Sequence, residues 1–109
     1  EPIGHGFMAS LERYADVRRL YPDAEMLMGI GNVTELTAAD TTGVNALLVA
    51  VCQELGIRAV LTTEVIPWAR GAVREVDVAR ALVRAAPVLM PALSSLSALS
   101  IRSIRPRRR

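Results

Sequence analysis

The sequence contains no lysine, because all thirteen of its basic residues are arginine. Lysine Schiff-base chemistry and a lysine clamp on a phosphate are therefore excluded for these 109 residues. The single cysteine, Cys52, has no second cysteine with which to form a disulfide, and no apolar run reaches the 18 residues of a membrane span. We therefore expect a cytoplasmic location and no membrane partner.

Histidine and aromatic residues are also scarce. The only histidine, His5, lies between two glycines without a nearby carboxylate motif, so no metal site is recognisable. Aromatic residues make up 4% of the sequence, which leaves little for base stacking. Residues 1–86 hold eight arginines against eleven acids, whereas residues 87–109 hold five arginines and no acid. The pI of 9.3 thus reflects the C-terminal segment, and we expect no nucleic-acid partner.

The hydrophobic content of 51% is sufficient for the core of one small domain. The sequence begins at Glu1 without an initiator methionine, and E-P-I-G at its start has the character of a strand end that enters a loop. We therefore expect a fragment of a larger domain.

Two short apolar runs, at residues 25–30 and 57–61, are typical of buried parallel strands. Each run ends in polar side chains: the first in G-I-G-N-V-T-E-L (residues 29–36) and the second in T-T-E (residues 62–64). Helical patterns precede, separate and follow the two runs. This order predicts an α/β fold with parallel strands joined by crossover helices.

The helix between the strands has the clearest pattern. Apolar residues recur at positions i, i+3, i+4 and i+7 from Val44 to Leu55. Thr37 and Asp40 form a loose capping box before it, and Gly56 is expected as its C′ residue. The other helices are expected from Ser10 to Pro22 and over about residues 72–86, where Pro87 should stop the last one.

Residues 87–109 differ from the rest in having prolines, serines and arginines without acids or clear caps. We expect a poorly ordered basic tail. A basic amphipathic membrane anchor and a shift of the reading frame after about Ala86 are alternative interpretations.

Five polar residues lie at or just beyond the predicted strand ends: Asn32, Glu35, Thr62, Thr63 and Glu64. Because the carboxyl ends of parallel strands meet at one rim, we expect these residues to form a site. Asn32 and Glu35 could instead satisfy turn and cap hydrogen bonds, and the two threonines could simply complete a strand. For Glu64 we favour a functional role, since a carboxylate at a strand end needs a partner or solvent.

Two further features of this region are less decisive. Gly29 and Gly31 are too few for a dinucleotide or Walker loop and instead favour a close approach of the backbone. Asn45 is an isolated polar residue near the start of the middle helix, and either a cap contact or a ligand contact would explain it.

Residues 1–86 resemble the last third of a dihydropteroate synthase, and specifically the synthase-like branch linked to methanopterin biosynthesis. E-P-I-G-H-G-F resembles the D-P-G-x-G-F-G strand end of that family, and M-G-I-G-N falls where the synthases carry G-x-S-R-K. The run G-V-N-A-L-L resembles the following helix, and V-L-T-T-E-V falls where the final strand carries R-x-H-D-V. The resemblance implies a partial (β/α)8 TIM barrel made of C-terminal βα units, followed by a segment at 87–109 that does not match.

The resemblance also implies a function: a pterin-binding transferase of pteridine biosynthesis, of the folate or tetrahydromethanopterin type. It places Glu1 where a family carboxylate binds the pterin, and it makes Asn32, Glu35, Thr62, Thr63 and Glu64 lining residues of the pterin site. It identifies no catalytic residue. The reaction that it suggests is condensation of a pterin with a ribosylated aminobenzene precursor.

The departures from the family concern its cationic anchors. Gly31, Asn32 and Val33 stand in place of Ser-Arg-Lys, and Leu61 to Thr63 stand in place of the arginine and histidine that hold a pyrophosphate. Stabilisation of a departing pyrophosphate is electrostatic work, so we expect the fragment to be inactive on its own. No cofactor is expected in the chain, and magnesium is not indicated.

Two other functions remain open: a non-catalytic pterin-binding domain, and a structural or interaction module with an arginine-rich tail. Two strands with three helices would leave sheet edges unpaired. We therefore expect marginal stability, or homo-oligomers formed through the exposed edges.

Overall fold

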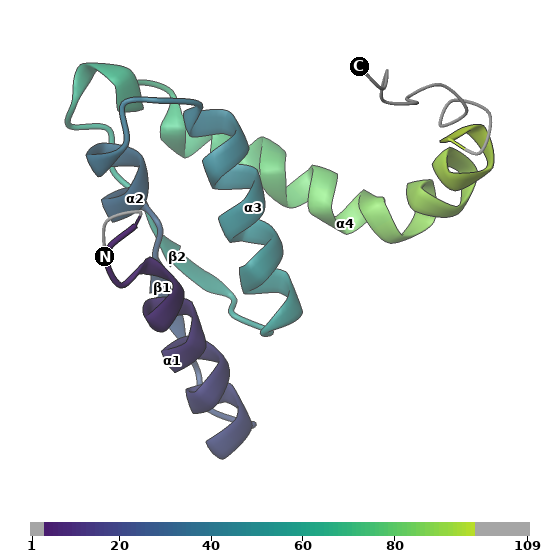
Figure 1. Cartoon of the computed structure of the whole chain (residues 1–109), viewed down its shortest axis with the longest axis horizontal. Helices are drawn as coiled ribbons and strands as arrows, with labels where there is room; N and C mark the ends of the chain where they lie inside the picture. The colour runs from purple at the N-terminus through teal and green to yellow at the C-terminus, as the bar shows by residue number, and fades with distance from the viewer. Residues whose placement is uncertain (1–3, 98–109) are drawn as a thin grey trace, which may run out of the picture.

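The computed structural model describes the backbone of residues 4–97 and the side chains of residues 4–87. Within this range the elements follow one another in an order that Figure 1 shows from the purple to the yellow end. They are α1 (Phe7–Leu20), β1 (Leu27–Gly29), α2 (Gly31–Leu36), α3 (Thr41–Glu54), β2 (Ala59–Leu61), the 3-10 helix η1 (Pro67–Ala69) and α4 (Ala72–Ser97).

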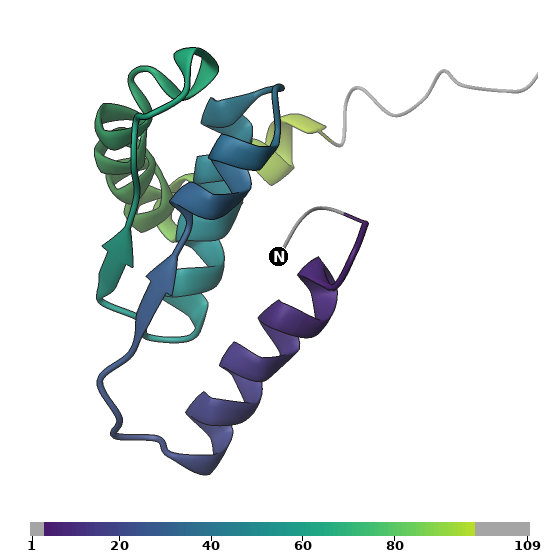
Figure 2. The same cartoon turned by 90° about the vertical axis from the view of Figure 1, so that its left-hand side faces the viewer.

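The two strands form one small parallel sheet, with Leu27 opposite Ala59 and Gly29 opposite Leu61. The predicted parallel pairing is therefore confirmed. In Figure 2 the two arrows run side by side in the same direction, with α1 and α3 on the same side of them. Met28 is buried against the helices, whereas Leu27 and Leu61 are 55% and 57% exposed. The apolar side chains of the opposite sheet face are thus largely uncovered.

The prediction of a partial (β/α)8 TIM barrel is wrong. The described part of the chain is an α-rich small domain, with two strands of three residues each. The predicted runs at 25–30 and 57–61 were longer than the strands, because only residues 27–29 of the first and 59–61 of the second pair. Moreover, the chain enters a helix, α2, directly after β1, where a strand-end loop was expected. A single short pair of strands cannot close into a barrel.

The middle helix is confirmed as α3. Asp40 caps its N-terminus, because its side chain accepts a hydrogen bond from the Gly43 amide at 2.9 Å. Gly56 takes the left-handed conformation with φ of 63°, and the Ile57 amide donates to the Cys52 carbonyl at 2.8 Å. This is the Schellman type of helix end, which glycine adopts without strain. Thr37 lies at the end of α2, so the predicted capping box does not form.

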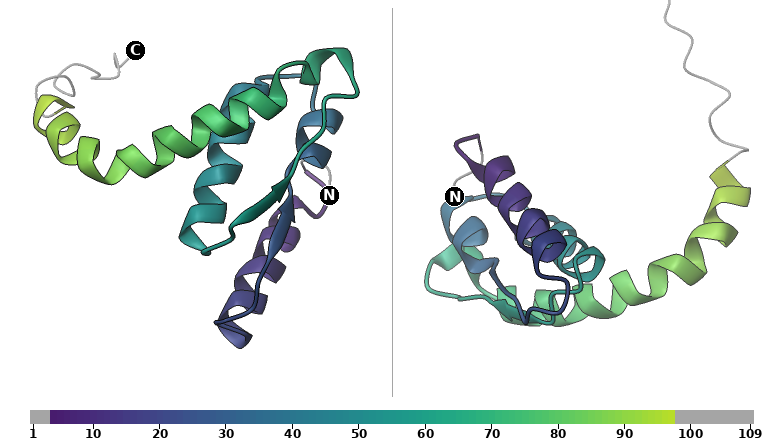
Figure 3. Two further views of the ribbon diagram at one scale, coloured as in Figure 1. Left: turned by 180° about the vertical axis from the view of Figure 1, so that it is seen from behind. Right: turned by 90° about the horizontal axis from the view of Figure 1, so that it is seen from below.

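Helix α4 does not stop at Pro87 but continues to Ser97. Proline lacks the amide hydrogen that would bond to the carbonyl four residues earlier, which here belongs to Val83. The Gln53 side chain of α3 donates to that carbonyl at 3.3 Å and so replaces the missing partner. Seen from behind in Figure 3, α4 crosses α3 and its C-terminal part extends beyond it. The predicted tail is thus helical up to Ser97, and residues 98–109 lie outside the described residues.

The core lies where α3 packs against the sheet and α4. Its fully or nearly buried members include Ile30, Met28, Leu48, Cys52 and Val76. The Cys52 sulfur lies 3.5 Å from the Met28 sulfur, and burial raises the pKa of the Cys52 thiol. This cysteine is therefore a core residue in its unreactive thiol form.

Helix α1 is attached more loosely, since none of its residues is fully buried. Phe7, Leu11 and Tyr14 pack against the core from its edge. The helix begins at Phe7, one turn earlier than the expected start at Ser10, and ends at Leu20 before Pro22 as expected.

Candidate functional site

The predicted site residues lie on α2 and on the loop after β2, at the carboxyl ends of the two strands. We call residues 31–36 and 62–66 together the rim. The rim follows directly from the sheet, because the Ile30 amide still bonds to the Leu61 carbonyl at 2.9 Å. The structure therefore brings Asn32 and Glu35 to the same end of the sheet as Thr62, Thr63 and Glu64. Glu1, the sixth predicted residue, lies outside the described residues.

Glu35 holds the two halves of the rim together. One carboxylate oxygen accepts from the Thr63 hydroxyl and the Val65 amide, both at 2.8 Å, and the other accepts from the Ile66 amide at 3.0 Å. The Val65 amide, then the Thr63 hydroxyl and the Ile66 amide, lower the pKa of Glu35 against an opposing effect of desolvation. Both oxygens of Glu35 therefore serve the loop after β2, which makes it a positioning residue.

Glu64 also has a partner within the chain. Its carboxylate accepts from the Val73 amide at 2.9 Å, in the first turn of α4. A carboxylate at a helix N-terminus satisfies an otherwise unbonded amide and interacts favourably with the helix dipole. The N-terminus of α4 is thus the partner that a carboxylate at this position requires.

Gly31 and Thr62 mark the closest contact within the rim. A Cβ atom on Gly31 would lie 2.8 Å from the Thr63 nitrogen and 3.1 Å from the Thr62 Cα. The close backbone approach inferred from the glycines is therefore present at Gly31. The Thr62 hydroxyl is buried beside this contact and has no hydrogen-bond partner among the described residues. A buried hydroxyl without a partner is costly, and it leaves Thr62 with unused hydrogen-bonding capacity at the rim.

Two other residues complete the rim. Asn32 is exposed on α2, and its side-chain nitrogen would lie 3.7 Å from a Cβ atom on Gly29. Thr34 is fully buried, and its hydroxyl donates to the Gly31 carbonyl at 3.0 Å. The indole of Trp68 donates to the Thr34 carbonyl at 3.1 Å and so fixes η1 to α2.

Asn45 connects two helices and does not cap one. Its amide donates to the Glu75 carboxylate at 3.1 Å, and the Thr41 hydroxyl donates to the other oxygen of that carboxylate at 3.3 Å. Asn45 is fully buried, and its side-chain oxygen has no partner among the described residues. The cap contact proposed for Asn45 is therefore absent, and its contact to Glu75 joins α3 to α4.

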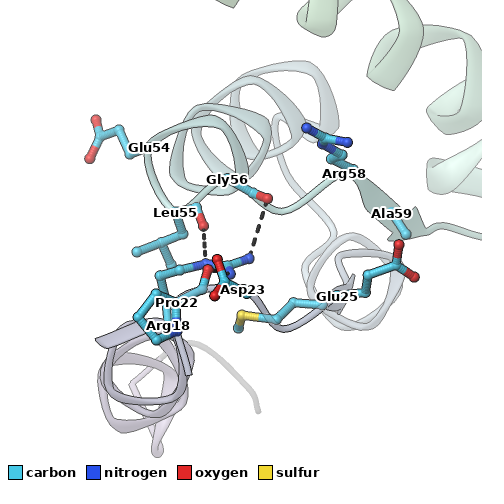
Figure 4. Close-up of a pocket in the computed structure, with 10 residues that line it drawn as sticks. Arg18, Pro22, Asp23, Glu25, Glu54, Leu55, Gly56, Arg58 and Ala59 are labelled. Atoms are coloured by element: carbon cyan, nitrogen blue, oxygen red, sulfur yellow. Dashed lines mark hydrogen bonds between the residues drawn. The ribbon is translucent and has the colours of Figure 1, made fainter. Parts of the chain in front are cut away.

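The opposite end of the sheet, where the strands begin, is shaped by arginines. We call residues 22–26 and 54–59 together the base. Figure 4 shows Arg18 of α1 reaching into a cavity of about 700 Å³ at the base. Its guanidinium donates to the Leu55 carbonyl at 2.7 Å and to the Ala24 carbonyl at 3.0 Å. Arg18 thus attaches α1 to the end of α3 and to the turn before β1.

A second cavity at the base, of about 870 Å³, adjoins the first. Its lining combines apolar residues of α3 and β2 with three arginines, Arg58, Arg80 and Arg84. Sequence reasoning assigned no role to these arginines. The available signals were Arg58, which interrupts an otherwise apolar run, and the one-turn spacing of Arg80 and Arg84 on α4.

Two general features are absent from the described residues. No group of three or more metal-binding side chains occurs among them. In the same part of the chain, no helix combines the length and apolar character needed to cross a membrane.

Comparison with known proteins found one sequence similarity. The chain is 38% identical over 81 residues to an uncharacterized protein of Methanocaldococcus jannaschii. The match covers 72% of this chain but only 15% of the relative, so the chain spans a small part of a much longer protein. No family model matches the chain, and no match was found among solved structures.

Proposed function

We propose that the rim binds a pterin, and that the chain is the pterin-binding part of a dihydropteroate synthase-like transferase of pteridine biosynthesis. The family resemblance of residues 1–86 supports this proposal. The observation that carries it is the buried Thr62 hydroxyl, which has no partner among the described residues. Small-molecule sites use a few placed polar groups to orient the ligand.

The polar groups of the rim divide into two sets. Glu35 and Glu64 are bonded to backbone amides, so they position the rim. Asn32 offers an amide donor and acceptor at the surface, and Thr62 offers a hydroxyl. A pterin presents ring nitrogens, an amino group and a carbonyl along one edge, which matches this mixture of neutral donors and acceptors. We therefore assign a direct contact to Asn32 and a second one to Thr62, whose buried hydroxyl must become accessible as the ligand binds, with Thr63 beside them.

The chain by itself should bind a pterin without turning it over. None of the six predicted site residues is a cation, and a departing pyrophosphate needs positive charge or a metal ion. Any transferase activity would require groups supplied by a longer protein. The relative, of which the match covers only 15%, is consistent with such a protein.

The proposal extends to assembly and location. The sheet has two unpaired edges and a face on which Leu27 and Leu61 are more than half exposed. Unpaired edges and exposed apolar side chains promote association, so we propose that copies of the chain form homo-oligomers through them. The single buried thiol suits the reducing cytoplasm, where we propose that the protein acts.

Calorimetric titration of the full chain with 7,8-dihydropterin tests the pterin site. Thr62→Val and Asn32→Ala should each weaken binding by roughly tenfold, which is the value of one or two hydrogen bonds. Thr62→Val should leave stability unchanged or slightly raised, since it removes a buried hydroxyl that lacks a partner. Glu1→Gln tests the contact that the resemblance suggests.

Thr42→Val is the matched control, because Thr42 lies on the exposed side of α3 outside the rim. It should leave the affinity unchanged. Absence of binding, or binding that is insensitive to Thr62→Val and Asn32→Ala, would contradict the pterin proposal. If deletion of residues 98–109 abolished binding to an acidic partner and no pterin bound, the interaction-module alternative would be favoured.

A further inference from the structure

The base cavity of about 870 Å³ brings together three arginines from two parts of the chain. Arg58 precedes β2 directly, and Arg80 and Arg84 lie one turn apart on α4. Gln53, which also lines the cavity, ties α3 to α4 beside Arg84 through the Val83 carbonyl at 3.3 Å. The three cations are thus held around one cavity by packed elements.

No acid is among the described residues that line this cavity, although Arg58 also borders the adjoining cavity, which Asp23, Glu25 and Glu54 line. Among the described residues, Arg58 and Arg84 have neither a hydrogen bond nor an ion pair. Within the described part of the chain Arg80 pairs only with Asp77, at 3.3 Å and on an exposed part of the helix surface. In Figure 4 the Arg58 guanidinium and the carboxylates of Glu25 and Glu54 point away from one another. Three arginines that line one cavity are unexpected here, since residues 1–86 carry more acids than bases.

Such an arrangement has an electrostatic cost in the absence of a ligand. Arg80 and Arg84 are like charges one helical turn apart, which destabilises a helix. No acid lies three or four residues before Arg84 to offset this repulsion. Local violations of this kind are typical of binding sites. Arginine pairs well with phosphate, because its planar guanidinium donates two parallel hydrogen bonds.

The remaining wall of the cavity is apolar. Val49, Cys52 and Ile57 are 5%, 3% and 6% exposed, and Val60 of β2 lines the cavity beside them. A ligand that fills the cavity would therefore contact both hydrocarbon and guanidinium groups. The volume is within the range of small-molecule sites.

We propose that this base cavity binds a phosphate ester with an apolar or aromatic body. Arg58 and Arg84 hold the phosphate, Arg80 adds positive charge, and the apolar wall packs against the body. The site lies at the opposite end of the strands from the rim and does not depend on pterin binding there.

Titration of the full chain with phenyl phosphate tests the proposal. Arg58→Gln and Arg84→Gln should each weaken binding by at least about tenfold, the effect of one charge-assisted contact. Arg74→Gln near the start of α4, which lines a different cavity, is the control, and its affinity should equal that of the unaltered chain. Inorganic phosphate should bind more weakly than phenyl phosphate, because it lacks the body that packs on the apolar wall.

A second readout separates binding from folding. Without ligand, Arg84→Gln should melt at the same or a higher temperature than the unaltered chain, because it removes a like-charge repulsion. With phenyl phosphate, only the unaltered chain and Arg74→Gln should gain stability. Undiminished binding in the Arg58→Gln Arg84→Gln double variant would overturn the proposal and place the anion on the C-terminal arginines. Absence of phenyl phosphate binding to the unaltered chain would overturn it as well.

Discussion

The rim and the base lie at opposite ends of the same two strands, and they differ in how their charged groups are bonded. At the rim, Glu35 and Glu64 accept hydrogen bonds from backbone amides, so the charges are used in building the fold. At the base, Arg18 also bonds to the backbone, where it donates to carbonyl groups. Arg58 and Arg84, in contrast, have no hydrogen-bond or ion-pair partner among the described residues.

This difference shows that a charged residue near a strand end is not by itself evidence for a ligand. The number of bonds that the group already makes decides the question. By that criterion the acids of the rim position the chain, and the group left for a ligand there is the neutral Thr62 hydroxyl. The groups left at the base are cations. The two ends should therefore differ in ligand chemistry, and the following changes test that contrast.

The largest effect is expected from Gly31→Ala, which would break the rim. The added Cβ would lie 2.8 Å from a backbone nitrogen, so a strand end or α2 must move. We expect a loss of about 1–3 kcal/mol in the free energy of unfolding, as for other overpacked sites. Urea unfolding measures it.

Gly29→Ala is the matched control for Gly31→Ala. Its added Cβ would meet only the Asn32 side chain at 3.7 Å, an ordinary contact. It should leave stability nearly unchanged. Equal losses for the two variants would contradict the close packing assigned to Gly31.

The next effect concerns Glu35 and acid. Because its folded-state pKa is lowered from the ordinary value of 4.5, the stability that Glu35 contributes is fully present above that value. It is lost as the pH falls below 4.5 through the folded-state pKa. Glu35→Gln should therefore destabilise the chain at pH 7 and make its stability less sensitive to acid. Urea unfolding midpoints at pH 7 and at a pH below 4.5 measure both effects.

Hydrogen exchange gives a local test of the same residue. At least one of the Val65 and Ile66 amides should lose protection in Glu35→Gln, because the two amides bond to different carboxylate oxygens and glutamine keeps only one oxygen. Glu12→Gln on α1 serves as the control and should leave these amides protected. Unchanged exchange in Glu35→Gln would show that Glu35 does not hold the loop.

A smaller effect is expected from Gln53→Ala, which acts near the base. It leaves the Val83 carbonyl without a partner at the point where Pro87 cannot supply one. We expect a loss of about 0.5–1.5 kcal/mol and faster amide exchange in α4 beyond Pro87. The neighbouring Glu54→Ala, which removes no hydrogen bond of the described residues, should have little effect on α4. Equal exchange in the two variants would remove the explanation given for the continuation of α4.

The smallest effect is expected from Asp77→Asn, which would sharpen the contrast by making the base more positive. The Asp77 to Arg80 pair is exposed, so its loss should cost only about 0.2–0.5 kcal/mol in stability. Affinity for phenyl phosphate should rise by roughly twofold, since Arg80 is released from its acid. A weaker affinity in calorimetry would contradict the role assigned to Arg80.

The sequence predicted individual elements better than their assembly. Helix α3 could be recognised because its apolar spacing agrees with its signals, Asp40 at the start and Gly56 at the end. The positions of the strands could be predicted but their lengths could not, because apolar residues next to a strand continue its sequence pattern without pairing. The barrel followed from family resemblance, and two strands of three residues do not support it.

Two other errors came from long-range contacts. Pro87 is a helix stop by local rules, but Gln53 from another helix supplies the partner of the freed carbonyl. The residues of the rim could be predicted from their positions at the strand ends. The hydrogen bonds that these residues form could not be predicted. Nothing in the local sequence indicates that Glu35 bonds to Thr63 and Ile66, which lie 28 and 31 positions further along the chain. The base cavity depends on the packing of α4 beside β2 and was not predicted.

The most direct test of this contrast is amide chemical-shift mapping of the labelled full chain with 7,8-dihydropterin and, separately, with phenyl phosphate. We predict that the pterin shifts amides of residues 31–35 and 62–65, and that phenyl phosphate shifts those of residues 56–60 and 80–84. The two sets should not overlap, and addition of the second ligand should not displace the first. Competition between the ligands, or shifts at the same residues for both, would contradict the account of one neutral and one cationic end.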